Sequence, residues 1–169
     1  MRLFLLATPL VALAATLASA QGTEVPFGGR HDSTLPVEIT SDALQLDQAA
    51  GTAVFTGQVK VGQGQLRLAA DRIEVFYVQA QGASSGQVER MNATGNVTLS
   101  NGTEAAEANA ATYTVATGIV EMEGDVLLTQ GVNAVSSQTL RIDLNSGTGR
   151  LDGRVKTIFT PGTTPRSAP

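Results

Sequence analysis

The chain has 169 residues, no cysteine, one histidine and a formal net charge of −4 at pH 7. The lack of cysteine excludes disulfides, thiolate metal sites and cysteine nucleophiles, and a single histidine cannot form a histidine cluster for zinc. The acidic charge argues against nucleic acid as a partner, because nucleic-acid phosphates require a basic protein surface. We therefore expect no cofactor, no metal site and no nucleic-acid partner.

The first 20 residues have the pattern of a secretory signal peptide. A positive start at Arg2 is followed by an apolar run from Leu3 to Leu17, and the segment closes on the small-residue site Ala18-Ser19-Ala20. An uncleaved membrane anchor is the alternative, but the run is shorter than the roughly 20 residues that cross a bilayer. It is also interrupted by Pro9. We predict cleavage before Gln21 and export of the mature chain.

Two segments flank the predicted domain. Residues 21–35 are rich in glycine, proline and polar residues and predict a flexible lead-in, and residues 161–169 predict a disordered tail. The domain between them covers residues 36–160. Its short alternations, such as Leu66-Arg67-Leu68 and Ile73-Glu74-Val75, have a period of two. This period indicates half-buried β-strands with one face on a core.

One stretch departs from the alternating pattern. Residues Glu104 to Ala111 are rich in alanine and resemble a helix in composition, but they lead directly into the alternating string Tyr113-Thr114-Val115. We predict a loop and a strand here, so that the whole domain is all-β.

Two half-motifs recur along the domain. The first is a strand written apolar-x-Gly-x-Val, and its glycines, Gly57, Gly95, Gly124 and Gly153, are 38, 29 and 29 residues apart. The second is an alternating apolar pair with a similar period. Such a period predicts stacked strand units that bury their apolar faces only against neighbours. Each glycine is expected on the same face as the following valine, where it permits a bend that curves the sheet around an interior. The alternating pairs are Leu44/Leu46, Ile73/Val75, Tyr113/Val115 and Leu140/Ile142.

Two carboxylates raise the hypothesis of an enzyme. Asp42 and Asp71 occupy matched positions, two residues before an alternating pair, and paired carboxylates serve as acid and base in polysaccharide cleavage. The other two repeats carry Ala111 and Gln138 at that position, which favours a turn or strand-edge role. The sequence contains no P-loop. We predict that the protein is not an enzyme.

Basic residues are spread over the domain, and arginine suits the geometry of a phosphate. The alternative for each of them is a solvated polar strand face. They are Arg67, Arg72, Arg90, Arg141, Arg150, Arg154 and Lys156.

Three strings in a fixed order carry a family resemblance. The string from Pro36 to Asp42 looks like an opening strand, and the string from Val54 to Val61, followed by Gln63-Gly64, looks like a signature strand. The string from Leu66 to Ile73 looks like the x-Ala-Asp-x-apolar strand that follows. Later repeats fit more loosely, out to Phe159. In this order after a signal peptide, the strings resemble the lipopolysaccharide transport periplasmic protein A family, also called the OstA-like N-terminal family.

The resemblance implies a curved antiparallel β-jelly roll with a hydrophobic interior that accepts lipid A acyl chains. It implies a periplasmic carrier or bridge that moves lipopolysaccharide from the inner to the outer membrane for outer-membrane assembly. The implied partners are lipopolysaccharide, an inner-membrane export component, an outer-membrane assembly protein and further copies joined head to tail. The residues expected to line the interior groove are Phe55, Val59, Val61, Leu66, Leu68, Ile73, Val75, Val97, Leu99, Tyr113, Val115, Met122, Val126, Leu128, Leu140 and Ile142.

The same apolar stripe is also compatible with an ordinary dry core, and an exported structural or adhesin-like β-repeat protein is the alternative function. An open stack of strands leaves an unpaired strand at each end, and unpaired edges recruit further strands. We predict partner edges at Val37 and Ile39 at the N-terminal end, and at Val155 and Ile158 at the C-terminal end.

Overall fold

The computed structural model describes residues 22–29, 31–80 and 83–159. The predicted signal peptide and the predicted tail lie outside these residues. Within the described part, the chain forms eleven strands of one sheet and no helix, so the prediction of an all-β fold is confirmed. The strands are β1 (Thr23–Pro26), β2 (Glu38–Thr40), β3 (Ala43–Asp47), β4 (Thr52–Gln63), β5 (Leu66–Ala80), β6 (Ala83–Asn101), β7 (Glu104–Thr114), β8 (Ile119–Gln130), β9 (Asn133–Asp143), β10 (Thr148–Asp152) and β11 (Lys156–Ile158).

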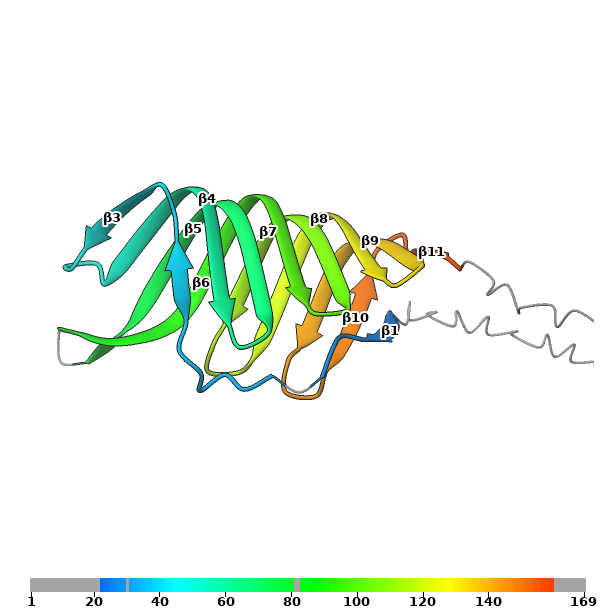
Figure 1. Ribbon diagram of the computed structural model, residues 1–169, viewed down its shortest axis with the longest axis horizontal. Coiled ribbons are helices and arrows are strands. Elements are labelled where there is room, and N and C mark those ends of the chain that lie inside the picture. Colours follow the sequence, from blue (N-terminus) through cyan, green and yellow to red (C-terminus); the bar gives the residue numbers. More distant parts are fainter. Residues whose placement is uncertain (1–21, 30, 81–82, 160–169) are drawn as a thin grey trace, which may run out of the picture.

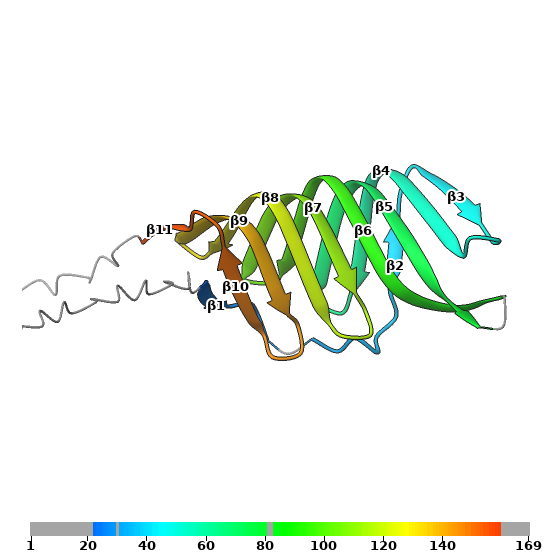
Figure 2. The ribbon, with the colours of Figure 1, turned by 180° about the vertical axis from the view of Figure 1, so that it is seen from behind.

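The sheet is antiparallel and folds over on itself (Figures 1 and 2). Its order is β1-β10-β9-β8-β7-β6-β5-β4-β2, while β3 also pairs with β4 and β11 also pairs with β9. The long strands bend midway, which divides the sheet into two facing arms. The first arm contains β1, β3 and β10, and the second arm contains β2 and β11. The bends form a closed ridge, and the strand ends form the opposite side, which we call the mouth.

The bends coincide with the repeated glycines, as predicted. In β4, Gly57 and Gln58 have φ values of +78° and +44°. The β4–β5 register shifts between Thr56 and Val59, so Gly57 and Gln58 together lie opposite the single residue Asp71. This is a β-bulge, which increases the local twist and bends the strand. Its first residue has a positive φ, which glycine adopts without steric cost. The same pair of positive φ values recurs at Gly95, Gly124 and Gly153 and at the residue after each of them.

The predicted face of these glycines is wrong. A Cβ atom built on Gly57 would lie 2.4 Å from the carboxylate of Asp42, and one built on Gly95 would lie 2.5 Å from that of Asp71. Both aspartates are exposed. The open side of each glycine therefore faces a polar side chain on the outer ridge, because the bulge interrupts the alternation that would have placed it beside the inward valine.

The residue predicted to be equivalent to Asp42 and Asp71 in the third repeat also needs correction. Gly124 faces Asn109, just as Gly57 faces Asp42 and Gly153 faces Gln138. The position equivalent to the aspartates is therefore Asn109 and not Ala111. Ala111 itself is buried and pairs with Met122, so the inward pair of this repeat is Ala111 and Tyr113.

The alanine-rich stretch belongs wholly to β7, with no loop over its first residues. Ala106 and Ala108 are buried while Ala105 and Glu107 are exposed. The period-two pattern is thus present, but its inward members are alanines, which a search for large apolar residues passes over.

The prediction of a flexible lead-in over residues 21–35 is wrong for the residues that the structure describes. β1 pairs with β10 over Thr148–Leu151, and Phe27 is completely buried. From there the chain runs along the mouth to β2 (Figures 1 and 2). We call residues 27–29 and 31–37 the strap. Its partners come from distant parts of the chain, so its local composition did not indicate them.

No helix in the described ranges is long and apolar enough to cross a membrane.

Candidate functional site

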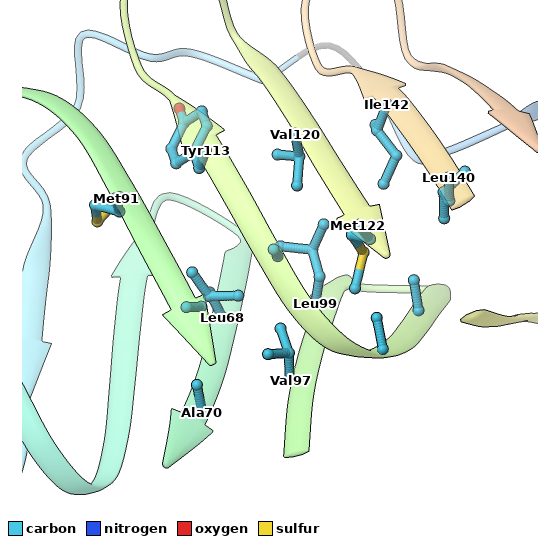
Figure 3. Close-up of a cluster of buried hydrophobic side chains, with 14 of the residues drawn as sticks. Leu68, Ala70, Met91, Val97, Leu99, Tyr113, Val120, Met122, Leu140 and Ile142 are labelled. Carbon is cyan, nitrogen blue, oxygen red and sulfur yellow. The ribbon is translucent and has the colours of Figure 1, made fainter. Parts of the chain in front are cut away.

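The predicted interior residues converge in one apolar cluster between the two arms (Figure 3). Fourteen of the sixteen are buried, with at most 5% of their surface exposed. Phe55 and Val115 are half-buried and pack against the cluster, and Val115 lies just beyond the end of β7. The structure therefore brings the predicted set together. Contact of these residues with a lipid stays a prediction.

The cluster is built from rows of residues that lie side by side on neighbouring strands. In the first arm, Ile73 pairs with Ala93, Ala93 with Ala111, and Ala111 with Met122. Directly opposed residues on one face of a sheet touch each other, so a large side chain beside an alanine fills the space evenly. The inward residues that the sequence analysis missed are Phe27, Ala53, Ala70, Met91, Ala93, Ala106, Ala108, Ala111, Val120, Val135, Leu144 and Leu151.

The interior is filled by these side chains. A cavity of about 10 Å³ lies between the arms, lined by residues that include Leu68, Met91, Leu99 and Tyr113. This volume is close to the minimum that holds one water molecule. The interior is thus an apolar core along the folded sheet, and this cavity within it is too small for an acyl chain.

One polar residue, Gln63, lies at the mouth end of this core. Gln63 ends β4 in the second arm and is 2% exposed. Its Oε1 accepts a hydrogen bond of 2.9 Å from the Tyr113 hydroxyl, which lies near the end of β7 in the first arm. Burial raises the pKa of Tyr113 to about 12, so this hydroxyl stays protonated and donates throughout the physiological range. The pair therefore joins the two arms.

Gln63 also holds the strap. Its Oε1 lies 3.0 Å from His31 Nε2, and its Nε2 donates to the carbonyl oxygens of Ser33 and Leu35 at 2.9 and 3.0 Å. The side chain thus has a partner for each of its polar atoms, as burial of an amide requires. The sequence offered no signal for this role, because Gln63 is an ordinary polar residue beside a turn.

Apolar side chains are exposed at the two ends of the sheet. At the N-terminal end, Leu44 and Leu46 of β3 are 52% and 62% exposed. At the C-terminal end, Ile158 of β11 is 55% exposed and Phe159 is 74% exposed. Leu44 pairs with Phe55, so it continues an inward row that has no further paired strand among the described residues.

The predicted edge residues lie at these same two ends. Val37 and Ile39 are half-buried, and Ile39 pairs with Val61 of β4. Val155 is half-buried between β10 and β11. The first arm at the C-terminal end is already covered, because β1 pairs with β10. The end strands there are β1 in the first arm and β11 in the second.

The arginines lie on outer surfaces, where most of those named above have local partners. Arg72, Arg141 and Arg150 form ion pairs with Glu74, Glu121 and Asp152. Arg67 donates to the carbonyl oxygens of Gly64 and Leu66, and Arg90 lies 4.2 Å from the centroid of the Phe76 ring.

The two carboxylates of the enzyme hypothesis belong to the ridge. Asp71 accepts a hydrogen bond of 2.8 Å from Asn96 Nδ2, and Asp42 covers Gly57. This arrangement supports a role in the bends. Within the described residues, no three His, Cys, Asp or Glu side chains are grouped as metal ligands.

Three similarities to known proteins bear on the family of this chain. Residues 38–148 match the family model described as LptA/(LptD N-terminal domain) LPS transport protein. An uncharacterized protein of Rhizobium meliloti (strain 1021) is 30% identical over 157 residues, which cover 88% of this chain and 84% of that protein. In three dimensions, the chain is similar to LptH from Pseudomonas aeruginosa, whose crystal structure is described as the LptA homologous periplasmic component of the conserved lipopolysaccharide transport device. The TM-score is 0.67 at 17% identity, covering 78% of this chain and 99% of LptH.

The structural similarity is in the fold, the curved β-jelly roll. The family model covers more than half of the chain and spans β2 through the start of β10, which includes both arms and the apolar interior between them. The chain therefore belongs to the LptA/(LptD N-terminal domain) family of lipopolysaccharide transport proteins.

Proposed function

We propose that the protein is a periplasmic carrier or bridge that binds lipopolysaccharide by its acyl chains, without catalysing a reaction. The observation that carries this proposal is the continuous apolar interior between the two arms, in a chain that belongs to a lipopolysaccharide transport family. Each buried methylene contributes about 0.8 kcal/mol of transfer free energy. A lipid with several acyl chains therefore binds without a dedicated polar site.

The cellular setting is part of the same proposal. LptH is described as a periplasmic component of the transport device, and the N-terminal 20 residues have the pattern of a signal peptide cleaved before Gln21. The partners would be an inner-membrane export component, an outer-membrane assembly protein and further copies of this chain. The energy for transport would be supplied by the partners.

A structural β-repeat protein with a permanently dry core is the second candidate, and the packed interior favours it. The two candidates differ in whether the interior ever contacts a lipid.

Site-specific photocrosslinking in cells tests this difference. A photoreactive residue at Phe55 or Ile73 is expected to capture lipopolysaccharide, because both side chains lie in the interior cluster. Matched positions on the same two strands are Lys60, which is exposed, and Glu74, which pairs with Arg72 on the outer face. Capture from these outward positions alone would contradict interior binding, and capture from none of the four would support the structural candidate.

The exposed ends support head-to-tail assembly. Leu44 and Leu46 at one end and Ile158 and Phe159 at the other are exposed, although large apolar side chains are usually buried. The two ends differ, so contact between them would be heterologous and would extend as a filament. Strand addition at β11 would also align the interiors of neighbouring copies.

Replacing Ile158 with proline is expected to abolish this assembly, because proline removes one backbone donor from β11. The expected result is a monomer at protein concentrations at which the wild type forms larger species, measured by analytical ultracentrifugation. Ile158→Val, which keeps the donor and an apolar side chain, is the control and should assemble normally. A folded Ile158→Pro variant that assembles like the wild type would show that β11 is not the joint.

A further inference from the structure

The strap crosses the mouth of a protein whose proposed cargo has to enter there. We propose that the strap is a displaceable closure, and that lipid acyl chains enter the interior only after it leaves the mouth. This inference rests on the proposed function and adds the step by which the packed interior becomes accessible.

The strap bonds to both arms in turn. The Phe27 amide donates to the carbonyl oxygen of Gly147 at 2.9 Å, and the His31 amide donates to that of Leu144 at 3.0 Å. Gly147 and Leu144 lie in the turn between β9 and β10, at the mouth end of the first arm. On the second arm, Gln63 binds His31 and the strap carbonyls of Ser33 and Leu35. The strap therefore ties the arms together along the mouth.

Phe27 is the residue of the strap that fills part of the interior. Its side chain is completely buried, with 0% of its surface exposed to solvent. It packs in the same cluster as Ile142 and Leu151. Just before it, Gln130 of the second arm donates to the carbonyl oxygen of Pro26. An acyl chain that occupies this part of the interior would take the place of the Phe27 ring.

The interior has to expand to hold a lipid. Its cavity measures about 10 Å³, whereas pockets for small organic ligands measure roughly 300–1,000 Å³. The arms are covalently continuous at the ridge, where each long strand passes through its bend. They are joined at the mouth by the strap and by the bond from Tyr113 to Gln63. Opening therefore requires release at the mouth, where no strand passes between the arms.

The strap is suited to leave without unfolding the sheet. Phe27 is its one fully buried side chain among the described residues, and Leu35 is 41% exposed. Its other attachments are the half-buried side chain of Val37, which packs against the cluster, and hydrogen bonds that water can replace. Segments with few buried apolar contacts open at lower free energy than the strands of a core. The β-strands of both arms pair with each other independently of the strap.

A disulfide across the mouth tests the closure. A Cβ atom built on Gly28 lies 3.2 Å from Asn101 Cβ at the end of β6, close to the roughly 3.5–4.5 Å found in disulfides. The chain has no other cysteine, so Gly28→Cys/Asn101→Cys forms a single defined crosslink. We expect the oxidised variant to bind less than one tenth of the purified lipopolysaccharide that the reduced variant binds, measured by co-elution in gel filtration. Gly28→Cys alone has the same backbone strain at φ +66° and should bind like the wild type.

The outcomes separate the strap from the proposed function. Equal binding by the oxidised and reduced forms would overturn the closure and leave the carrier function intact. Failure of the wild type itself to bind lipopolysaccharide would overturn both.

Hydrogen exchange of the unmodified mature chain gives a second readout. When lipopolysaccharide is added to saturation, the amides of Phe27 and His31 should exchange at least tenfold faster, because their acceptors on the first arm are lost. The amide of Asp42, which donates to Gly57 at the ridge, should not change. Unchanged protection of Phe27 and His31 in a saturated complex would overturn the closure.

Discussion

Leu128→Asp is expected to unfold the protein, while Leu127→Asp one residue earlier on β8 leaves it folded. Leu128 has no exposed surface and lies in the interior cluster, whereas Leu127 is 37% exposed on the outer face. A carboxylate at position 128 would be buried without a partner, which costs several kcal/mol. Such a cost is comparable with the whole stability of about 5–15 kcal/mol of a typical domain.

Urea denaturation followed by circular dichroism measures both variants. The pair is matched in residue type, strand and substitution, so intrinsic strand propensity cancels and the difference reports the face alone. Leu127→Asp should change the free energy of unfolding by about 0.5 kcal/mol or less, as is usual at exposed positions. Equal losses for the two variants would mean that β8 does not have the register described here.

Phe27→Ala is expected to release the strap. Truncation of a buried phenylalanine costs about 3–5 kcal/mol in lost transfer free energy and cavity formation, and Phe27 is the strap's main apolar anchor. The cost falls on docking of the strap, because the pairing of the arms does not depend on it. The His31 amide, which donates to Leu144, should therefore lose most of its protection from hydrogen exchange.

Phe159→Ala is the matched control, because Phe159 is 74% exposed and contributes little to the fold of one chain. Its effect on the exchange of the His31 amide should be negligible. If Phe27→Ala left the His31 amide fully protected, the hydrogen bonds of Gln63 would hold the strap without the Phe27 side chain. The closure would then depend on polar contacts at the mouth.

β1 and the strap belong to one segment of chain. β1 pairs with β10 and leads directly into Phe27. Release of the whole segment would uncover the β10 edge, which β1 covers in the closed form. Entry of a lipid would then favour addition of a neighbouring copy, because the β10 edge becomes a second site for strand addition besides β11.

The pattern of the sequence determined the class of fold and most of the interior. Strands of period two place alternate residues on one face, so the apolar partners of Leu68 or Ile142 are identifiable without coordinates. The glycines at 57, 95, 124 and 153 marked the bends, since only a residue without a side chain enters this backbone conformation freely. The family followed from the order of these strings, and the family model over residues 38–148 confirms it.

The tertiary structure alone decided the frame of the third repeat and the direction of the bend glycines. A bulge inserts one extra residue into one strand only, so alternation counted through it reaches the wrong face. The inward alanines at 106, 108 and 111 were overlooked because their role depends on the large residues opposite them on neighbouring strands. Opposite residues are set by pairing between strands, which composition does not reveal.

The strap shows most clearly what the sequence leaves open. Residues 22–35 have no alternation and a composition typical of a flexible segment, yet His31 meets Gln63 across 32 positions and Pro26 meets Gln130 across 104. The bonds that order this segment are made to strand ends of both arms, which lie together only in the folded sheet. The local sequence pattern therefore predicts the sheet, because each strand pairs mainly with its neighbours along the chain. It does not predict the strap, because the contacts that hold the strap come from distant residues of the folded sheet.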